Sequence, residues 1–253
     1  MDKSPYKVVG LLLIALGTTW PQAGCGPAAP KDSGGEGATK VIKAEAKSAQ
    51  DYFPFAVGNS WTYDEVEQQS GSQIGTRNMR STITLKVTNV VNKPEGISAD
   101  VGVFDQDSKK IGAVVFLAAK DALYQTELLY KGKPMTLEPP MCVAVYPSEP
   151  SNGKTWTGVG PKPWVGTTGK YTLKVEGLGP VEVDGVNERF ACLGFHTTAE
   201  YDEGSQHIQY EQKSYYAPRV GIVRTLEMVQ VFSKGQQIGT VTKVSTLRSH
   251  TLK

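Results

Sequence analysis

The chain has 253 residues and a nearly balanced charge, with 27 Lys and Arg residues against 25 Asp and Glu residues. A formal net charge of +2 is too small for the phosphate attraction on which nucleic-acid binding depends, so no nucleic-acid partner is predicted. The length after removal of a leader suits one folded domain.

The first 24 residues have the order of a bacterial lipoprotein signal peptide. A short basic start precedes the apolar run 8–16, which is shorter than the roughly 20 apolar residues that span a bilayer. Small Ala23 and Gly24 stand before Cys25, as in a lipobox, although Gln22 replaces the usual aliphatic residue. We therefore predict cleavage before Cys25 and acylation of its thiol, by palmitate for example. Ordinary signal cleavage with Cys25 as a free thiol is the alternative.

The residues after Cys25 predict where the protein is located and how it is tethered. Gly26 is not the aspartate that retains lipoproteins in the inner membrane, so in a Gram-negative cell we expect the outer membrane, facing the periplasm. Residues 25–50 are rich in Gly, Pro, Ala, Ser and Lys, with Val41 and Ile42 as the only large aliphatic residues. Such a segment buries too little surface to offset its ordering entropy, which predicts a disordered tether.

Residues 51–253 predict a single antiparallel all-β domain. Apolar residues at 83, 85 and 87 alternate with polar residues, and 171, 173 and 175 alternate in the same way. Further strands are expected near 60–68, 97–105, 111–118, 122–129, 189–201, 206–216, 220–232 and 237–248. No long segment has a helical period.

An internal repeat is predicted within this domain, with copies at 51–145 and 146–253. Gly58-Asn59-Ser60-Trp61-Thr62 corresponds to Gly153-Lys154-Thr155-Trp156-Thr157, and both copies continue to Thr-Leu-Lys-Val. Each copy would have one apolar sheet face. Packing these faces together predicts either a two-repeat sandwich or a strongly curved, barrel-like sheet with Trp61 and Trp156 as core residues.

Three segments resemble a family of uncharacterised bacterial envelope lipoproteins, the TapB-like proteins. They are Tyr52-Phe53-Pro54 with Gly58-Asn59 and Trp61, Val181–Gly185 before Phe190, and Tyr215–Val223. The resemblance implies an exported β-rich domain without an established activity, similar in shape to the curved sheets of periplasmic lipoprotein carriers. Asp184 and Arg219 depart from the family pattern, which commonly has Pro and Gly there.

Neither the cysteines nor a search for known motifs indicates a catalytic site. Cys142 and Cys192 allow one disulfide, but we favour two buried free thiols. Catalytic motifs such as Gly-x-Ser-x-Gly and His-Glu-x-x-His are absent from the sequence, so it predicts neither an enzyme nor a cofactor.

One constellation of titratable residues is a candidate metal site, although a solvated set of polar cross-strand pairs is the preferred interpretation. If 190–201 and 206–216 form a hairpin with Asp202 facing Ser205, Glu200 lies opposite His207 and His196 opposite Glu211. Two imidazoles and two carboxylates on one face are ligands that suit zinc.

The leading functional hypothesis is a membrane-anchored binding or interaction domain. Its partners would be the membrane, through the lipid anchor, and either an apolar small molecule or an envelope protein. Pro163 and Trp164, in the Gly- and Pro-rich segment 158–169, are the candidate contact residues, unless Trp164 folds back over the core. A purely structural lipoprotein and a hydrolase with an unrecognised site are the alternatives.

Overall fold

The computed structural model describes residues 41–42, 45–71, 75–130, 132–163 and 166–253, and these residues are almost entirely β-structure. A short 3-10 helix, η1 (Ala49–Tyr52), precedes the long strands. The strands are β1 (Val41–Ile42), β2 (Ser60–Gly71), β3 (Arg77–Lys93), β4 (Gly96–Phe104), β5 (Lys110–Ala118), β6 (Ala122–Tyr130), β7 (Lys133–Val145), β8 (Gly153–Pro161), β9 (Thr168–Asp184), β10 (Arg189–Glu203), β11 (Gln206–Ala217), β12 (Gly221–Ser233) and β13 (Gln236–Thr251). Within the described ranges, no helix has the length and apolarity to cross a membrane.

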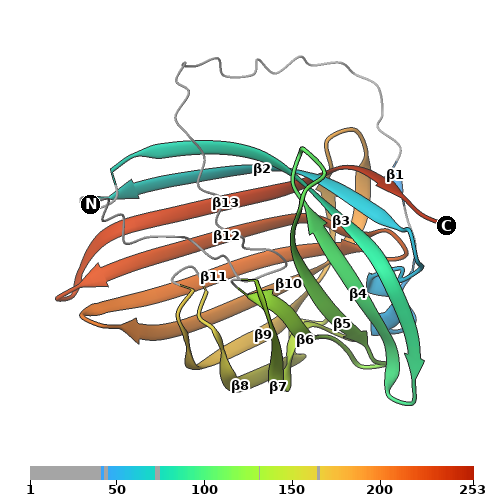
Figure 1. Ribbon diagram of the computed structural model, residues 1–253, viewed down its shortest axis with the longest axis horizontal. Coiled ribbons are helices and arrows are strands. Elements are labelled where there is room, and N and C mark those ends of the chain that lie inside the picture. The colour runs from blue at the N-terminus through green and yellow to red at the C-terminus, as the bar shows by residue number, and fades with distance from the viewer. Residues whose placement is uncertain (1–40, 43–44, 72–74, 131, 164–165) are drawn as a thin grey trace.

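The long strands form one antiparallel sheet in the order β7-β6-β5-β4-β3-β2-β13-β12-β11-β10-β9-β8, and β1 adds a short parallel pair to β10. Figure 1 shows this sheet curving round on itself, so that β7 and β8, at its two ends, lie near each other. The prediction of an antiparallel all-β fold is confirmed. Of the two predicted architectures, the structure has the curved, barrel-like sheet.

The sheet consists of two six-stranded meanders whose limits match the predicted copies. Strands β2 to β7 lie within 51–145 and strands β8 to β13 within 146–253. The first hairpin of each meander has the same register, with the pairs Trp61–Leu85 and Trp156–Leu173 and the hydroxyl contacts Thr62–Thr84 and Thr157–Thr172. The repeat itself stays a prediction, since these matches concern the hairpins alone.

The turns before these two hairpins are also alike. The side-chain amide of Asn59 donates to the carbonyl of Pro54 over 2.7 Å, and that of Asn152 donates to the carbonyl of Pro147 over 2.9 Å. In both places a proline is followed five residues later by the asparagine that closes the turn. The same proline–asparagine turn therefore occurs twice, once before each of these hairpins.

Side chains, and no backbone ladder, join β7 to β8 at the seam of the barrel. The indole Nε1 of Trp156 donates to the carbonyl of Pro139 over 2.7 Å. A Cβ added to Gly158 would approach the same indole ring to 2.4 Å, so the ring lies directly on the backbone there. Three prolines at 134, 139 and 140 lack the N–H that a further strand would need, which suits β7 to a sheet edge.

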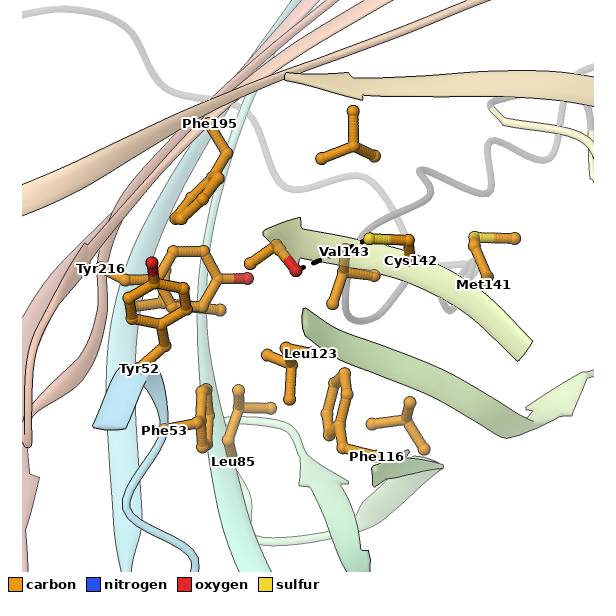
Figure 2. Packing of buried hydrophobic residues seen from close by; sticks show 14 of the residues in the cluster. Tyr52, Phe53, Leu85, Phe116, Leu123, Met141, Cys142, Val143, Phe195 and Tyr216 are labelled. Carbon is orange, nitrogen blue, oxygen red and sulfur yellow. Dashed lines mark hydrogen bonds between the residues drawn. The ribbon is translucent and has the colours of Figure 1, made fainter. Parts of the chain in front are cut away.

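The segment around η1 fills one part of the interior with aromatic side chains (Figure 2). Tyr52 and Phe53 are almost completely buried, and the ring of Phe53 lies 4.4 Å from that of Trp61. The hydroxyl of Tyr52 donates to the carbonyl of Val145 over 2.9 Å, while its ring packs 5.2 Å from Phe195. This part of the interior is a packed core.

Candidate functional site

The hairpin of β10 and β11 carries the predicted metal residues, but its register differs from the prediction. Gly204 and Ser205 form the turn, because the first central position of a two-residue hairpin turn needs a positive φ, and Gly204 has a φ of 60°. The predicted turn would have placed Glu203 at that position. As a result Glu200 lies opposite Gln209, and His196 lies opposite Lys213.

In the corrected register only two of the four predicted ligands, His196 and Glu211, lie beside each other, while His207 pairs with Asp202 instead of Glu200. Nε2 of His196 lies 3.1 Å from a carboxylate oxygen of Glu211, without the alignment of a hydrogen bond. Nδ1 of His207 lies 3.0 Å from Asp202, at the other end of the hairpin. Among the described residues, no group of three or more His, Cys, Asp or Glu side chains is placed to hold a metal ion.

The same polar face contains a depression of about 410 Å³ on the outside of the sheet, over β9 to β12. We call it the outer depression. It is lined by Thr172, Lys174, Thr198, Ala199, Glu200, Gln209, Tyr210, Glu211, Met228 and Gln230. Two rows run across the strands, Lys174–Thr198–Glu211–Met228 and Glu200–Gln209–Gln230. Short Thr198 lies among longer side chains, which explains a hollow at this point.

Several side chains of the outer depression have no partner within the part of the chain that the structure describes. Thr198, Glu200, Gln209 and Gln230 make no side-chain hydrogen bond or ion pair there. All four are half-buried or exposed, so they are accessible from solvent. These donors and acceptors are available to a ligand without the breaking of an internal contact.

Opposite charges are mixed at the margin of the outer depression. Lys174 pairs with Glu176 over 2.7 Å, and Glu211 lies within 3.3 Å of Lys213 as well as beside His196. The lining itself contributes one ammonium and two carboxylates. Because positive and negative groups alternate, the surface has no strong preference for an anion or a cation.

A second polar cluster, which the sequence analysis missed, lies on the inner face of β2, β12 and β13. Glu65 accepts hydrogen bonds from Ser245 and from Ser81, each over 3.0 Å, and its Oε1 lies 2.8 Å from Nζ of Lys243. Glu227 accepts a bond from the hydroxyl of Tyr210 over 3.3 Å. We call Glu65, Glu67, Glu227 and Lys243 the inner charge cluster. In these strands the four residues stand at positions that alternate in step with the buried apolar residues. This alternation is the sequence signal that could have predicted their place on the inner face.

The environment of the inner charge cluster changes the acidity of two members. Burial raises the pKa of Glu227 to about 7, although Lys243 opposes the shift. Burial alone would lower the pKa of Lys243, but Glu65 and Glu227 together hold it above its ordinary value. Because the members bind one another, the cluster is a largely satisfied network, unlike the outer depression.

The remaining predicted site residues fall in other places. Pro163 is buried, and its carbonyl accepts a hydrogen bond from Tyr201, so it is not an exposed contact. Residues 158–161, expected to be irregular, belong to β8. Cys142 and Cys192 are buried free thiols, the arrangement favoured from the sequence. Cys25 and Trp164 lie outside the described residues.

Comparison with known proteins gives no family for this chain. No model of a protein family matches it, and no curated protein matches it. Two solved structures are similar, both with a TM-score of 0.45 and 12% identity. One is a Bacteroides fragilis protein described as exported with a YmcC-like fold, which covers 79% of this chain and 98% of its own. The other is a Parabacteroides distasonis protein described as a lipoprotein, with coverages of 82% and 100%.

Proposed function

We propose that this chain is a lipid-anchored protein of the bacterial cell envelope whose β domain binds a polar ligand in the outer depression. The observation that carries the binding role is the contrast between two polar surfaces. The inner charge cluster uses its groups on one another, whereas Thr198, Glu200, Gln209 and Gln230 are uncommitted around a hollow. Free groups that converge on a depression are typical of a binding site.

The choice of a polar ligand replaces the apolar ligand expected from the sequence. The aromatic side chains at η1 fill the interior beside Trp61, and the outer depression is lined mainly by hydroxyl, amide and charged groups. The anchor is supported by the order of charge, apolar run and small residues before Cys25.

Methionine oxidation tests the binding role, because Met228 lines the outer depression and Met79, 43% exposed on β3, is a built-in reference. Full-length chain is treated with dilute peroxide in native envelope membranes and, separately, after purification in detergent. Sulfoxide at each position is then quantified by peptide mass spectrometry. We expect Met228 to oxidise at least about threefold more slowly in native membranes, with Met79 unchanged, because a bound ligand excludes the oxidant. Equal rates for Met228 in both preparations would reject occupancy of the depression.

The anchor is tested separately by Cys25→Ser. We expect wild-type chain to incorporate labelled palmitate and to sediment with membranes, and the variant to do neither, because stable anchoring depends on the acyl chains. Cys142→Ser is the matched control and should retain both properties. Membrane sedimentation of an unlabelled Cys25→Ser chain would contradict a lipid anchor.

A purely structural role is the second candidate, and the packed interior at η1 favours it. The two candidates differ in one measurable property. A structural protein leaves the outer depression filled with water alone, so the oxidation rate of Met228 would not depend on the preparation.

A further inference from the structure

We infer that the ligand of the outer depression is a neutral, hydroxyl-rich molecule, a sugar unit, held by the side-chain amides of Gln209 and Gln230 and by the groups around them. This inference rests on the proposed binding role of the depression and adds the chemical class of its ligand. Gln209 and Gln230 are directly paired across β11 and β12, so their side chains leave the same face of the sheet from neighbouring positions.

The hydrogen-bonding inventory of the outer depression matches hydroxyl groups. A sugar hydroxyl donates one hydrogen bond and accepts others, so its site needs both functions at close spacing. Amides at Gln209 and Gln230 and the hydroxyl of Thr198 offer both. Glu200 adds an acceptor and Lys174 adds donors. A ligand with donors only, or with acceptors only, would leave part of this set unpaired, which costs affinity.

The charges of the outer depression argue against a strongly ionic ligand. Glu211 is within 3.3 Å of Lys213 and 3.1 Å of His196, and Lys174 is within 2.7 Å of Glu176, so these charges are already opposed. Of the three charged residues that line the outer depression, Glu200 is the one that makes no ion pair with another described residue. A dianion would face Glu200 and Glu211, and a dication would face Lys174. A neutral ligand avoids both conflicts.

The size and shape of the site agree with a small ligand. Its volume of about 410 Å³ lies at the lower part of the range for small-molecule sites, roughly 300–1,000 Å³. Met228 provides an apolar surface at the end of one row, against which the carbon face of a sugar ring would pack. Strands on both sides hold these side chains on a rigid sheet, which limits the ordering cost of binding.

Binding of named sugars to the full-length chain tests the inference. The chain is purified in dodecylphosphocholine micelles, which carry no sugar headgroup, and titrated with D-glucose, D-galactose and N-acetyl-D-glucosamine by saturation-transfer NMR. The same sugars are presented as the ends of immobilised oligosaccharides. Binding of the free sugars alone identifies a soluble sugar as the ligand source, and binding of the oligosaccharides identifies a glycan end; either supports the inference.

The variants Gln209→Met and Gln230→Met locate the binding, because they keep the side-chain length and remove the amide. We expect the double variant to bind about tenfold more weakly, since two neutral hydrogen bonds are lost. Gln68→Met, at an exposed position on β2, is the matched control and should bind like wild type. Unfolding midpoints in urea identify any variant that has lost its fold.

Two results would overturn the inference. One is the absence of saturable binding for every sugar by the wild-type chain, or binding of succinate or putrescine in their place. The other is sugar binding that is unchanged in a folded double variant. If Met228 is protected in native membranes while no sugar binds, the proposed binding role stands and only the sugar assignment fails.

Discussion

At the scale of single residues, the buried carboxyl of Glu227 is the group whose chemistry the fold changes most clearly. It is 8% exposed, it lies opposite Lys243 in the β12–β13 ladder, and it also faces Glu65, Glu67 and Tyr210. Burial penalises its charged form, so the pKa rises from 4.5 to about 7. The fold holds a proton on this group at pH values where the unfolded chain has released it.

Stability should therefore fall as pH rises through this window. Between pH 4.5 and about 7 the folded state binds more protons at Glu227 than the unfolded state does, so the free energy of unfolding decreases, by about 3 kcal/mol in all. Glu227→Gln removes this contribution. We expect the variant to gain stability relative to wild type as pH rises from 4.5 to 7.5, measured by urea unfolding. Exposed Glu95→Gln should show a constant difference, and a constant difference for Glu227→Gln would contradict the prediction.

Arg219 has a backbone conformation that residues with a side chain rarely adopt. Its φ is 62°, a left-handed conformation in which glycine has no steric penalty. Its backbone N–H donates to the carbonyl of Asp51 over 2.7 Å, which fixes the turn before β12.

At the scale of elements, the seam between β7 and β8 is where the barrel depends on side chains. Trp156 is 3% exposed, donates to the carbonyl of Pro139 and packs edge-on against Tyr171 at 5.1 Å. Lys154 on β8 adds a contact to the other half of the sheet, because its ammonium contacts the carboxylate of Asp121 in the turn between β5 and β6. One indole therefore joins two strands that share no ladder.

Trp156→Phe tests that dependence. The change removes the hydrogen bond to Pro139 and leaves a smaller ring, so we expect a loss of about 1–3 kcal/mol in the free energy of unfolding. Val159→Ala on the same strand, at a residue that is 54% exposed, should change stability by less than about 0.5 kcal/mol. The measurement is urea unfolding followed by circular dichroism. An unchanged midpoint for Trp156→Phe would show that the seam does not depend on the indole.

At the scale of the whole molecule, the chain end of the second meander lies near the start of the first. We therefore expect the fold to form whichever meander comes first along the chain. The backbone N–H of Lys253 donates to the side chain of Asn59 over 2.8 Å, so the end of the second meander lies beside the start of the first. Residues 149–151, between the meanders, are exposed. Exposed connections of this kind tolerate new chain ends.

A circular permutant tests this arrangement. We expect a chain that is opened between Pro150 and Ser151, with Lys253 joined to Glu45 by a short Gly-Ser linker, to fold with the same near-ultraviolet circular dichroism and cooperative urea unfolding. A permutant opened between Val229 and Gln230, in the middle of β12, should not fold, because it cuts two ladders. If the permutant opened between Pro150 and Ser151 does not fold under conditions where wild type folds, the order of the two meanders along the chain matters and the prediction is wrong.

The local pattern of the sequence was enough to find most of the strands, and its failures have physical causes. Alternation at 83–87 and 171–175 lies within β3 and β9, since one face of each strand packs on the core. Strand β7 was missed because Pro134, Pro139 and Pro140 argue against a central strand, and only the sheet order shows that β7 is an edge. The hairpin at Gly204 was placed in the wrong register, so the predicted pairing of Glu200 with His207 is absent, whereas His196 still lies beside Glu211 although it is directly opposite Lys213.

The sequence by itself determined the fold class and the position of most strands, and it predicts a lipoprotein-type leader, because these features depend on side-chain order over a few residues. Only the tertiary structure decided that the sheet closes into a barrel, that Glu227 is buried beside Lys243, and that free amides at Gln209 and Gln230 border a hollow. Each of these depends on which strands are neighbours and in which register. Pairing between distant strands is set by the packing of the whole core, so no short window of the sequence contains it.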